Sequence, residues 1–137
     1  MSVILLDTNV ISELVRPHPE PRVVAFLNSQ TDPLISAVTL HEIAYGIDKA
    51  RDRNRRAKLI SWMASLRTEF QGRIVHVNEN IAERSGQMRA AAESAGIIIT
   101  PMDALIAASA AVHSAGVATR NVRDFAALGV AVIDPWK

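Results

Sequence analysis

The segment from Thr100 to Phe125 most constrains the fold, because it places two aspartates near the starts of two helices with a short strand between them. Thr100 is typical of a helix N-cap, a proline follows it, and Asp103 lies three residues after the cap. The body of this first helix is small and apolar enough to pack against a sheet. Asn121 is expected to cap the second helix, with Asp124 three residues later. Both carboxylates are therefore expected at one rim of the sheet.

Composition favours one domain with a full apolar core, spanning residues 1–137. The chain has 137 residues, of which 49% are hydrophobic, and this is too short for two such cores. It has no cysteine, which excludes disulfides, thiol catalysis and Cys-ligated zinc and favours a cytoplasmic protein. The longest uncharged run, residues 104–119, is too short and too polar for a membrane span. The net charge of +1 requires no acidic partner.

Short apolar segments alternate with helical patterns along the chain. Residues 3–6 form a continuous apolar run of the kind found in strands buried on both faces, and Asp7-Thr8-Asn9 leads from it into a helix. Residues 97–99 fit either a short strand or a buried connector. Further strands are expected at residues 34–38, 74–77, 117–119 and 131–133. This alternation predicts an α/β fold, with a parallel sheet that carries helices on both faces.

Four acidic residues are expected to meet at one end of that sheet. Asp7 follows the first strand, and Glu42 in Thr39-Leu40-His41-Glu42 is expected to open a helix as Asp103 and Asp124 do. Ligands of parallel sheets bind beyond the carboxyl ends of the strands. Carboxylates gathered there without a cation would repel one another, and Mg²⁺ or Mn²⁺ is the usual solution. The alternative for each acid alone is a helix cap that complements the helix dipole.

The basic stretch from Lys49 to Lys58 has six basic residues and one acidic residue. It is either a solvated face that keeps the protein soluble or a ridge that contacts phosphates, and the residues alone leave both open. The sequence offers no rival site: it lacks a phosphate-binding glycine loop. The histidines lie in unrelated contexts and are expected at surface or structural positions; they are His18, His41, His76 and His113.

Four blocks of the chain, taken in order, resemble the PIN-domain ribonucleases, and specifically the VapC and FitB type toxins of bacterial toxin–antitoxin pairs. The blocks are residues 5–9 (LLDTN), 42–46 (EIAYG), 103–108 (DALIAA) and 119–125 (TRNVRDF). The resemblance spans nearly the whole chain. It implies a three-layer PIN-like domain with a five-stranded parallel sheet flanked by helices. It also implies Mg²⁺- or Mn²⁺-dependent cleavage of single-stranded RNA, a homodimer, and neutralisation by a cognate antitoxin protein.

Carried over by position, the resemblance implies that the catalytic, metal-binding acids are Asp7, Glu42, Asp103 and Asp124. The first and third would be primary ligands, and the other two would complete an inner or a water-mediated shell. Whether Asp124 or Asn121 approaches the metal stays open.

Neighbouring residues are expected to assist the acids. Those expected either to orient water or to cap the backbone are Thr8, Asn9, Thr119 and Asn121. Those expected to contact the RNA backbone are Arg53, Arg55 and Arg56 of the basic stretch. Because no residue by itself reports activity, the alternative function is a catalytically inactive RNA-binding or regulatory interaction domain of the same fold.

Overall fold

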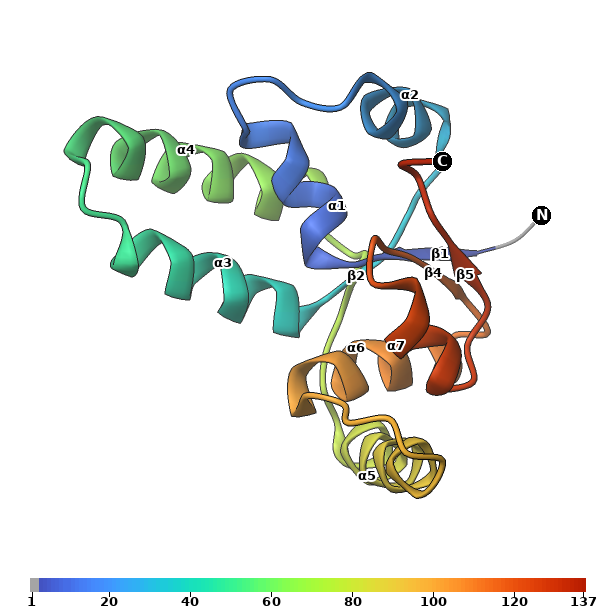
Figure 1. The fold of residues 1–137 in the computed structure, drawn as a ribbon. Coiled ribbons are helices and arrows are strands. Elements are labelled where there is room, and N and C mark those ends of the chain that lie inside the picture. Colours follow the sequence, from blue (N-terminus) through green and yellow to red (C-terminus); the bar gives the residue numbers. More distant parts are fainter. Residues whose placement is uncertain (1–2) are drawn as a thin grey trace.

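The computed structural model describes residues 3–137 as short parallel strands between layers of helices (Figure 1). The elements, with η1 a short 3-10 helix, are in chain order β1 (Ile4–Leu6), α1 (Thr8–Ser12), η1 (Glu13–Val15), α2 (Pro21–Ser29), β2 (Ile35–Ser36), α3 (Ala37–Lys49), α4 (Arg53–Glu69), β3 (Ile74–Val75), α5 (Glu79–Ser94), α6 (Pro101–Val112), β4 (Gly116–Ala118), α7 (Val122–Ala127) and β5 (Val132–Ile133). The strands lie where the sequence predicts them, with shorter or shifted bounds. Within residues 3–137, no helix combines the length and apolarity needed to cross a membrane.

The strands form two parallel sheets, so the predicted single five-stranded sheet is wrong. One sheet has the order β1-β4-β5 and the other pairs β2 with β3. An isolated parallel bridge between Leu5 and Leu34 connects β1 to the chain just before β2. The sheet is divided because β2 is too short to pair fully with β1. Val38 N donates to Ser36 Oγ at 3.1 Å, so Ser36 already caps α3 and the strand ends after two residues.

Helices cover both faces of the strands, as predicted for an α/β fold. Because side chains alternate along a strand, Leu5 packs on one face while Ile4 and Leu6 pack on the other. The first face carries the buried side chains of α5, α6 and α7. The second carries those of α1, α2 and α4 with the later part of α3. Figure 1 shows α5 and α6 on one side of the strands and α1 and α2 on the other.

Two local predictions are settled by the helix boundaries. Thr39 does not open α3, because the helix begins at Ala37 behind its Ser36 cap, so Glu42 lies in the second turn rather than the first. Of the two alternatives for residues 97–99, a strand or a buried connector, the structure shows the connector, with Ile99 buried.

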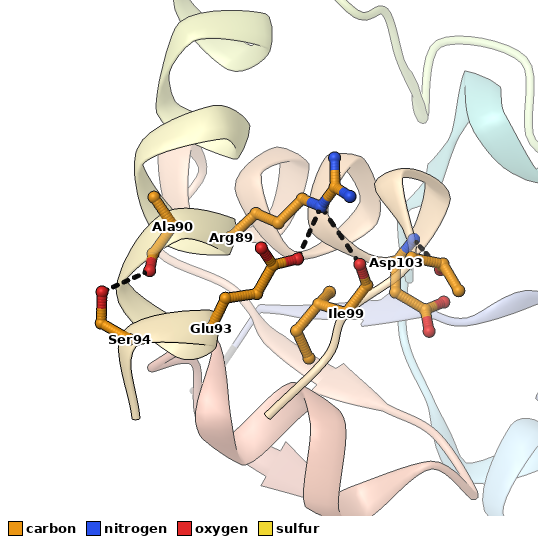
Figure 2. A network of polar contacts seen from close by, with 7 residues as sticks. Arg89, Ala90, Glu93, Ser94, Ile99 and Asp103 are labelled. Carbon is orange, nitrogen blue, oxygen red and sulfur yellow. Dashed lines mark hydrogen bonds and ion pairs between the residues drawn. The ribbon is translucent and has the colours of Figure 1, made fainter. Parts of the chain in front are cut away.

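The start of α6 is held in place from both sides. Its buried face consists mainly of alanines, which allow α6 to lie close to the strands and to α5. Arg89 on α5 donates from Nε to the Ile99 carbonyl at 3.1 Å and pairs with Glu93, which fixes the connector that leads into α6 (Figure 2). Thr100 then caps the helix by accepting from Asp103 N at 3.2 Å, as predicted. The position of Asp103 therefore follows from packing on α5.

Candidate active site

Asp7 is the most buried of the four acids, with 5% of its surface exposed at the end of β1. It is the N-cap of α1, and its Oδ1 accepts from Thr8 N at 2.8 Å. Its Oδ2 accepts from the Thr119 hydroxyl at 2.7 Å. Thr119 follows β4, the strand that pairs with β1, so adjacent parallel strands deliver both groups to the same edge.

Glu42 reaches this edge from α3, although it lies one turn further along the helix than the sequence predicts. The Thr8 hydroxyl donates to Glu42 Oε1 and lies 3.0 Å from the Thr39 hydroxyl. Since Thr8 has one hydroxyl hydrogen and gives it to the carboxylate, the Thr39 hydroxyl is the donor in the second contact. Thr8 therefore holds Glu42 in place, which goes beyond the predicted choice between water positioning and backbone capping.

Asn121 lies between the other two acids. Its Nδ2 donates to Asp103 Oδ2 at 3.2 Å and to Asp124 Oδ2 at 3.0 Å. The predicted side-chain cap on α7 is not made, because this amide is turned toward the carboxylates instead. Its backbone N–H donates to the Thr119 hydroxyl at 2.9 Å, so Asn121 is linked through Thr119 to Asp7. Asp103 and Asp124 thus lie on either side of one amide.

Asn9, which was also expected to assist the acids, lies at the same edge. Its Oδ1 accepts from Arg120 N at 3.3 Å, and its Nδ2 lies 3.5 Å from the Thr119 hydroxyl. Asn9 therefore ties α1 to the loop between β4 and α7.

Burial and mutual repulsion act on the acids together. Burial is the main cause that raises the pKa of Asp7 from 3.8 to about 6; hydrogen bonds from Thr119 and Thr8 oppose this, and the charges of Asp103 and Glu42 add to it. The pKa of Asp103 is also raised, first by burial and then by the charges of Glu42 and Asp124. Among the described residues, the ion pairs involve Glu13, Asp48 and Glu93, and no cation pairs with the four acids.

The donor atoms suit a hydrated divalent cation. In residues 3–137, no group of three or more His, Asp or Glu side chains is arranged to enclose a metal ion by itself. Mg²⁺ is commonly bound through only one or two carboxylates and keeps several waters. A set of oxygen donors with excess negative charge and no paired cation fits that mode of binding. The ligand roles of the individual acids stay a prediction.

The arginines of the basic stretch and the four histidines lie at the surface. Arg53, Arg55 and Arg56 are exposed near the start of α4. Arg55 donates from Nη1 to the Val15 carbonyl at 3.4 Å, and Arg56 pairs with Asp48 at 3.2 Å. All four histidines are exposed, as expected.

A cavity of about 440 Å³ adjoins the acids and was not foreseen from the sequence. Glu42, Thr8 and Arg55 line it together with both tryptophans of the chain, Trp62 and Trp136. These residues are far apart in the sequence, and a lone tryptophan on a helix or near a chain end carries no signal of a shared cavity.

The raised pKa of Asp7 predicts how the metal-free protein responds to pH. The folded state holds the Asp7 proton up to about pH 6, whereas the unfolded chain releases it near 3.8. Asp7 therefore lowers the free energy of unfolding as pH rises through this window, by up to roughly 3 kcal/mol at 1.36 kcal/mol per pKa unit. Urea melts in EDTA at pH 4, 5, 6 and 7 should show a smaller loss of stability in Asp7→Asn than in the wild type.

Asp32→Asn provides the control, since Asp32 is exposed and has a φ of 52°, which asparagine tolerates. That variant should keep the wild-type dependence on pH. An Asp7→Asn protein that loses as much stability between pH 4 and 7 as the wild type would contradict the raised pKa.

Comparison with known proteins shows the family of this chain. The PIN domain family model matches residues 4–130. Toxin FitB of Neisseria gonorrhoeae is 41% identical over 137 residues, covering 98% of this chain and 99% of that protein. VapC ribonuclease Y4jK of Sinorhizobium fredii is 31% identical over 138 residues, with 98% and 99% covered.

Solved structures share the fold of this chain. The crystal structure of FitAcB from Neisseria gonorrhoeae matches with a TM-score of 0.92 at 41% identity, covering 98% of this chain and 99% of that one. A toxin–antitoxin complex from Klebsiella pneumoniae matches with a TM-score of 0.72 at 26% identity, covering 98% of both chains. With a family model matching almost from end to end and relatives above 30% identity over their full length, this chain belongs to the PIN-domain family.

Proposed function

We propose that this protein is a Mg²⁺- or Mn²⁺-dependent endoribonuclease that cleaves single-stranded RNA. The observation that carries the proposal is the group of four carboxyl groups without a paired cation at one edge of the strands, where burial and neighbouring negative charges raise the pKa of Asp7 and Asp103. The name of the Sinorhizobium relative, a ribonuclease, supports the same activity.

The relatives also support a biological setting. FitB is named a toxin, and the Klebsiella structure is titled a toxin–antitoxin complex. We infer that this protein is likewise a toxin that a cognate antitoxin neutralises. The homodimer and the cytoplasmic location stay predictions.

The acids would divide the binding of the ion between them. Asp7 and Asp103 would hold it directly, and Glu42 and Asp124 would complete an inner or a water-mediated shell. When bound, such an ion would supply activation of a water nucleophile and neutralisation of charge on the scissile phosphate. Hydrogen bonds to the protein keep the carboxylates oriented, as ligands commonly require: Thr119 holds Asp7, Thr8 holds Glu42, and the Asn121 amide holds both Asp103 and Asp124.

Asn121 and Asp124 have complementary roles in this arrangement. The amide of Asn121 donates its hydrogens to the carboxylates of Asp103 and Asp124, so of Asn121 and Asp124 only the latter offers a negatively charged oxygen to a metal ion. We therefore assign the fourth acidic position to Asp124. Asn121 holds the carboxylates of Asp103 and Asp124 in position.

The purified protein is expected to cut single-stranded RNA in Mg²⁺ or Mn²⁺ and to stop when EDTA is added. Asp7→Asn, Glu42→Gln and Asp103→Asn should each lower the rate by at least about tenfold, since even the loss of a residue that only orients a metal ligand commonly costs 10- to 100-fold. Glu83→Gln, an exposed acid on α5, is the matched control and should keep the wild-type rate. Cleavage that persists in EDTA, or in Asp103→Asn at the wild-type rate, would refute the mechanism. RNA binding without cleavage by the wild type would favour the inactive interaction domain.

The stability of Asp103→Asn separates metal binding from helix capping. If Asp103 only complements the α6 dipole, its neutralisation should cost about 0.3–1 kcal/mol with or without metal. If it belongs to a group of repelling carboxylates, the variant should be more stable than the wild type in EDTA. The wild type gains about 2.7 kcal/mol when Mg²⁺ is a hundredfold above its dissociation constant, and the variant gains less, so Mg²⁺ should reverse the order.

Urea melts of both proteins in EDTA and in Mg²⁺ make this comparison. Glu79→Gln serves as the control, because Glu79 is a first-turn acid on α5 outside the site. It should lose the same small amount of stability in both buffers. If Asp103→Asn behaves as Glu79→Gln does, Asp103 is a capping residue and the proposed site loses a primary ligand.

The basic stretch is expected to bind phosphates of the RNA. Replacing Arg53, Arg55 and Arg56 by glutamine should weaken RNA binding and flatten its salt dependence, by about 0.7 in log–log slope for each phosphate that the protein no longer neutralises. Titrations of labelled RNA in EDTA at several salt concentrations measure the slope. The control is Arg67→Gln with Arg84→Gln, exposed arginines on the far part of α4 and on α5. Equal slopes in the triple variant and wild type would identify the stretch as a solvated face.

A further inference from the structure

The cavity beside the acids has an apolar, aromatic wall. Ile43 and Leu59 line it from α3 and α4, and the partly buried rings of Trp62 and Trp136 join them. Thr8 and Glu42, which are hydrogen-bonded to each other at the acidic site, also line the cavity. An occupant of the cavity would therefore lie next to whatever binds at the acids.

Trp136 is held in a fixed position near the end of the chain. Its backbone N–H donates to Asp134 Oδ1 at 2.9 Å, and its carbonyl accepts from Arg22 Nη1 at 3.3 Å. The Arg120 guanidinium lies over the ring, 5.0 Å from its centre. Such a cation–π contact keeps the guanidinium beside the ring on the lining of the cavity.

Exposed arginines surround this wall. Arg16, Arg55 and Arg120 all line the cavity, and each is exposed to solvent. Arg16 pairs with the buried carboxylate of Glu13 at 3.4 Å, and Arg55 donates to the Val15 carbonyl, so both are tethered to η1. Arg120 is one residue beyond Thr119, which binds Asp7. A cavity lined by both arginines and aromatic rings matches an unpaired nucleotide, with its anionic phosphates and flat apolar base.

We propose that this cavity seats one unpaired nucleobase of the RNA strand, adjacent to the phosphate held at the acidic site. The tryptophans contact the base, and the three arginines that line the cavity contact the flanking phosphates. This inference rests on the proposed ribonuclease function and adds to it the position of a neighbouring nucleotide. A base paired within an A-form helix is stacked and cannot enter such a cavity, so the seat also favours single-stranded RNA.

The two tryptophans are the only ones in the chain, which makes intrinsic fluorescence a direct probe of the cavity. In EDTA, a single-stranded decaribonucleotide should quench or shift this fluorescence. A decamer of the same length and charge made of abasic ribonucleotides should leave it nearly unchanged. Trp136→Phe keeps an aromatic ring and leaves Trp62 as the reporter, so the two contributions can be separated.

Binding of labelled decamers, followed by anisotropy, gives a second measurement. Trp136→Leu should weaken binding of the normal decamer by about tenfold to a hundredfold, the range for loss of one stacked base, and should leave binding of the abasic decamer unchanged. Trp136→Phe should restore most of the loss. Urea melts confirm that each variant is folded, and the wild-type comparison of the two decamers needs no variant.

The outcomes separate this inference from the proposed function. Equal fluorescence changes with both decamers, or no binding of either, would overturn the nucleobase seat. Cleavage in Mg²⁺ without base-dependent fluorescence would overturn the seat alone. Base-dependent fluorescence and binding without cleavage would support the seat and overturn the ribonuclease.

Discussion

The buried carboxyl group of Asp7 is the constraint on which the rest of the site depends. Its two hydrogen bonds, from Thr8 N and from the Thr119 hydroxyl, do not outweigh the effect of burial, because its pKa still rises to about 6. An ionised Asp7 therefore destabilises the metal-free fold, and a cation would relieve that cost. Every neighbouring contact is consistent with this: Thr119 binds Asp7 and Asn121 together, and the amide of Asn121 reaches the other two aspartates.

The scaffold holds these charges in place by close packing elsewhere. The α6 helix is buried through alanines, isoleucine and a serine, which bring its axis close to α5 and the strands. Its serine, Ser109, lies 3.3 Å from Ser36 Oγ, the cap of α3, so the two helices that carry Asp103 and Glu42 touch through a buried pair of hydroxyls. Repulsion between the carboxylates of Asp103 and Glu42 is thus resisted by contacts in the apolar interior, where a shift would open a cavity.

Local sequence signals predict much of this arrangement, and the exceptions have physical causes. The caps at Asp7 and Thr100 identify helix starts because each cap lies within a few residues of its effect. The predicted start of α3 is wrong because Ser36 and Thr39 are both good caps by residue type, and the helix begins after Ser36. This earlier start also shortens β2. Asn121 is a good cap by residue type, yet its side chain binds Asp103 on α6 as well as Asp124 on α7. The partner on α6 lies 18 residues earlier in the sequence, so local sequence does not indicate it. The cavity lined by the two tryptophans cannot be predicted from local sequence either, because residues of α3, α4 and the end of the chain line it together.

Helix capping and metal binding are compatible roles for the same residues. Asp103 and Asp124 lie in the first turns of α6 and α7, where the helix dipole favours a negative charge. At α6 the Thr100 hydroxyl accepts the capping hydrogen bond from Asp103 N, so the carboxylate of Asp103 is available to accept from Asn121. The dipoles offset part of the repulsion among the acids, which helps the metal-free protein tolerate the cluster. A carboxylate in the first turn of a helix therefore destabilises the metal-free fold less than a carboxylate elsewhere in the site, because the helix dipole stabilises its charge.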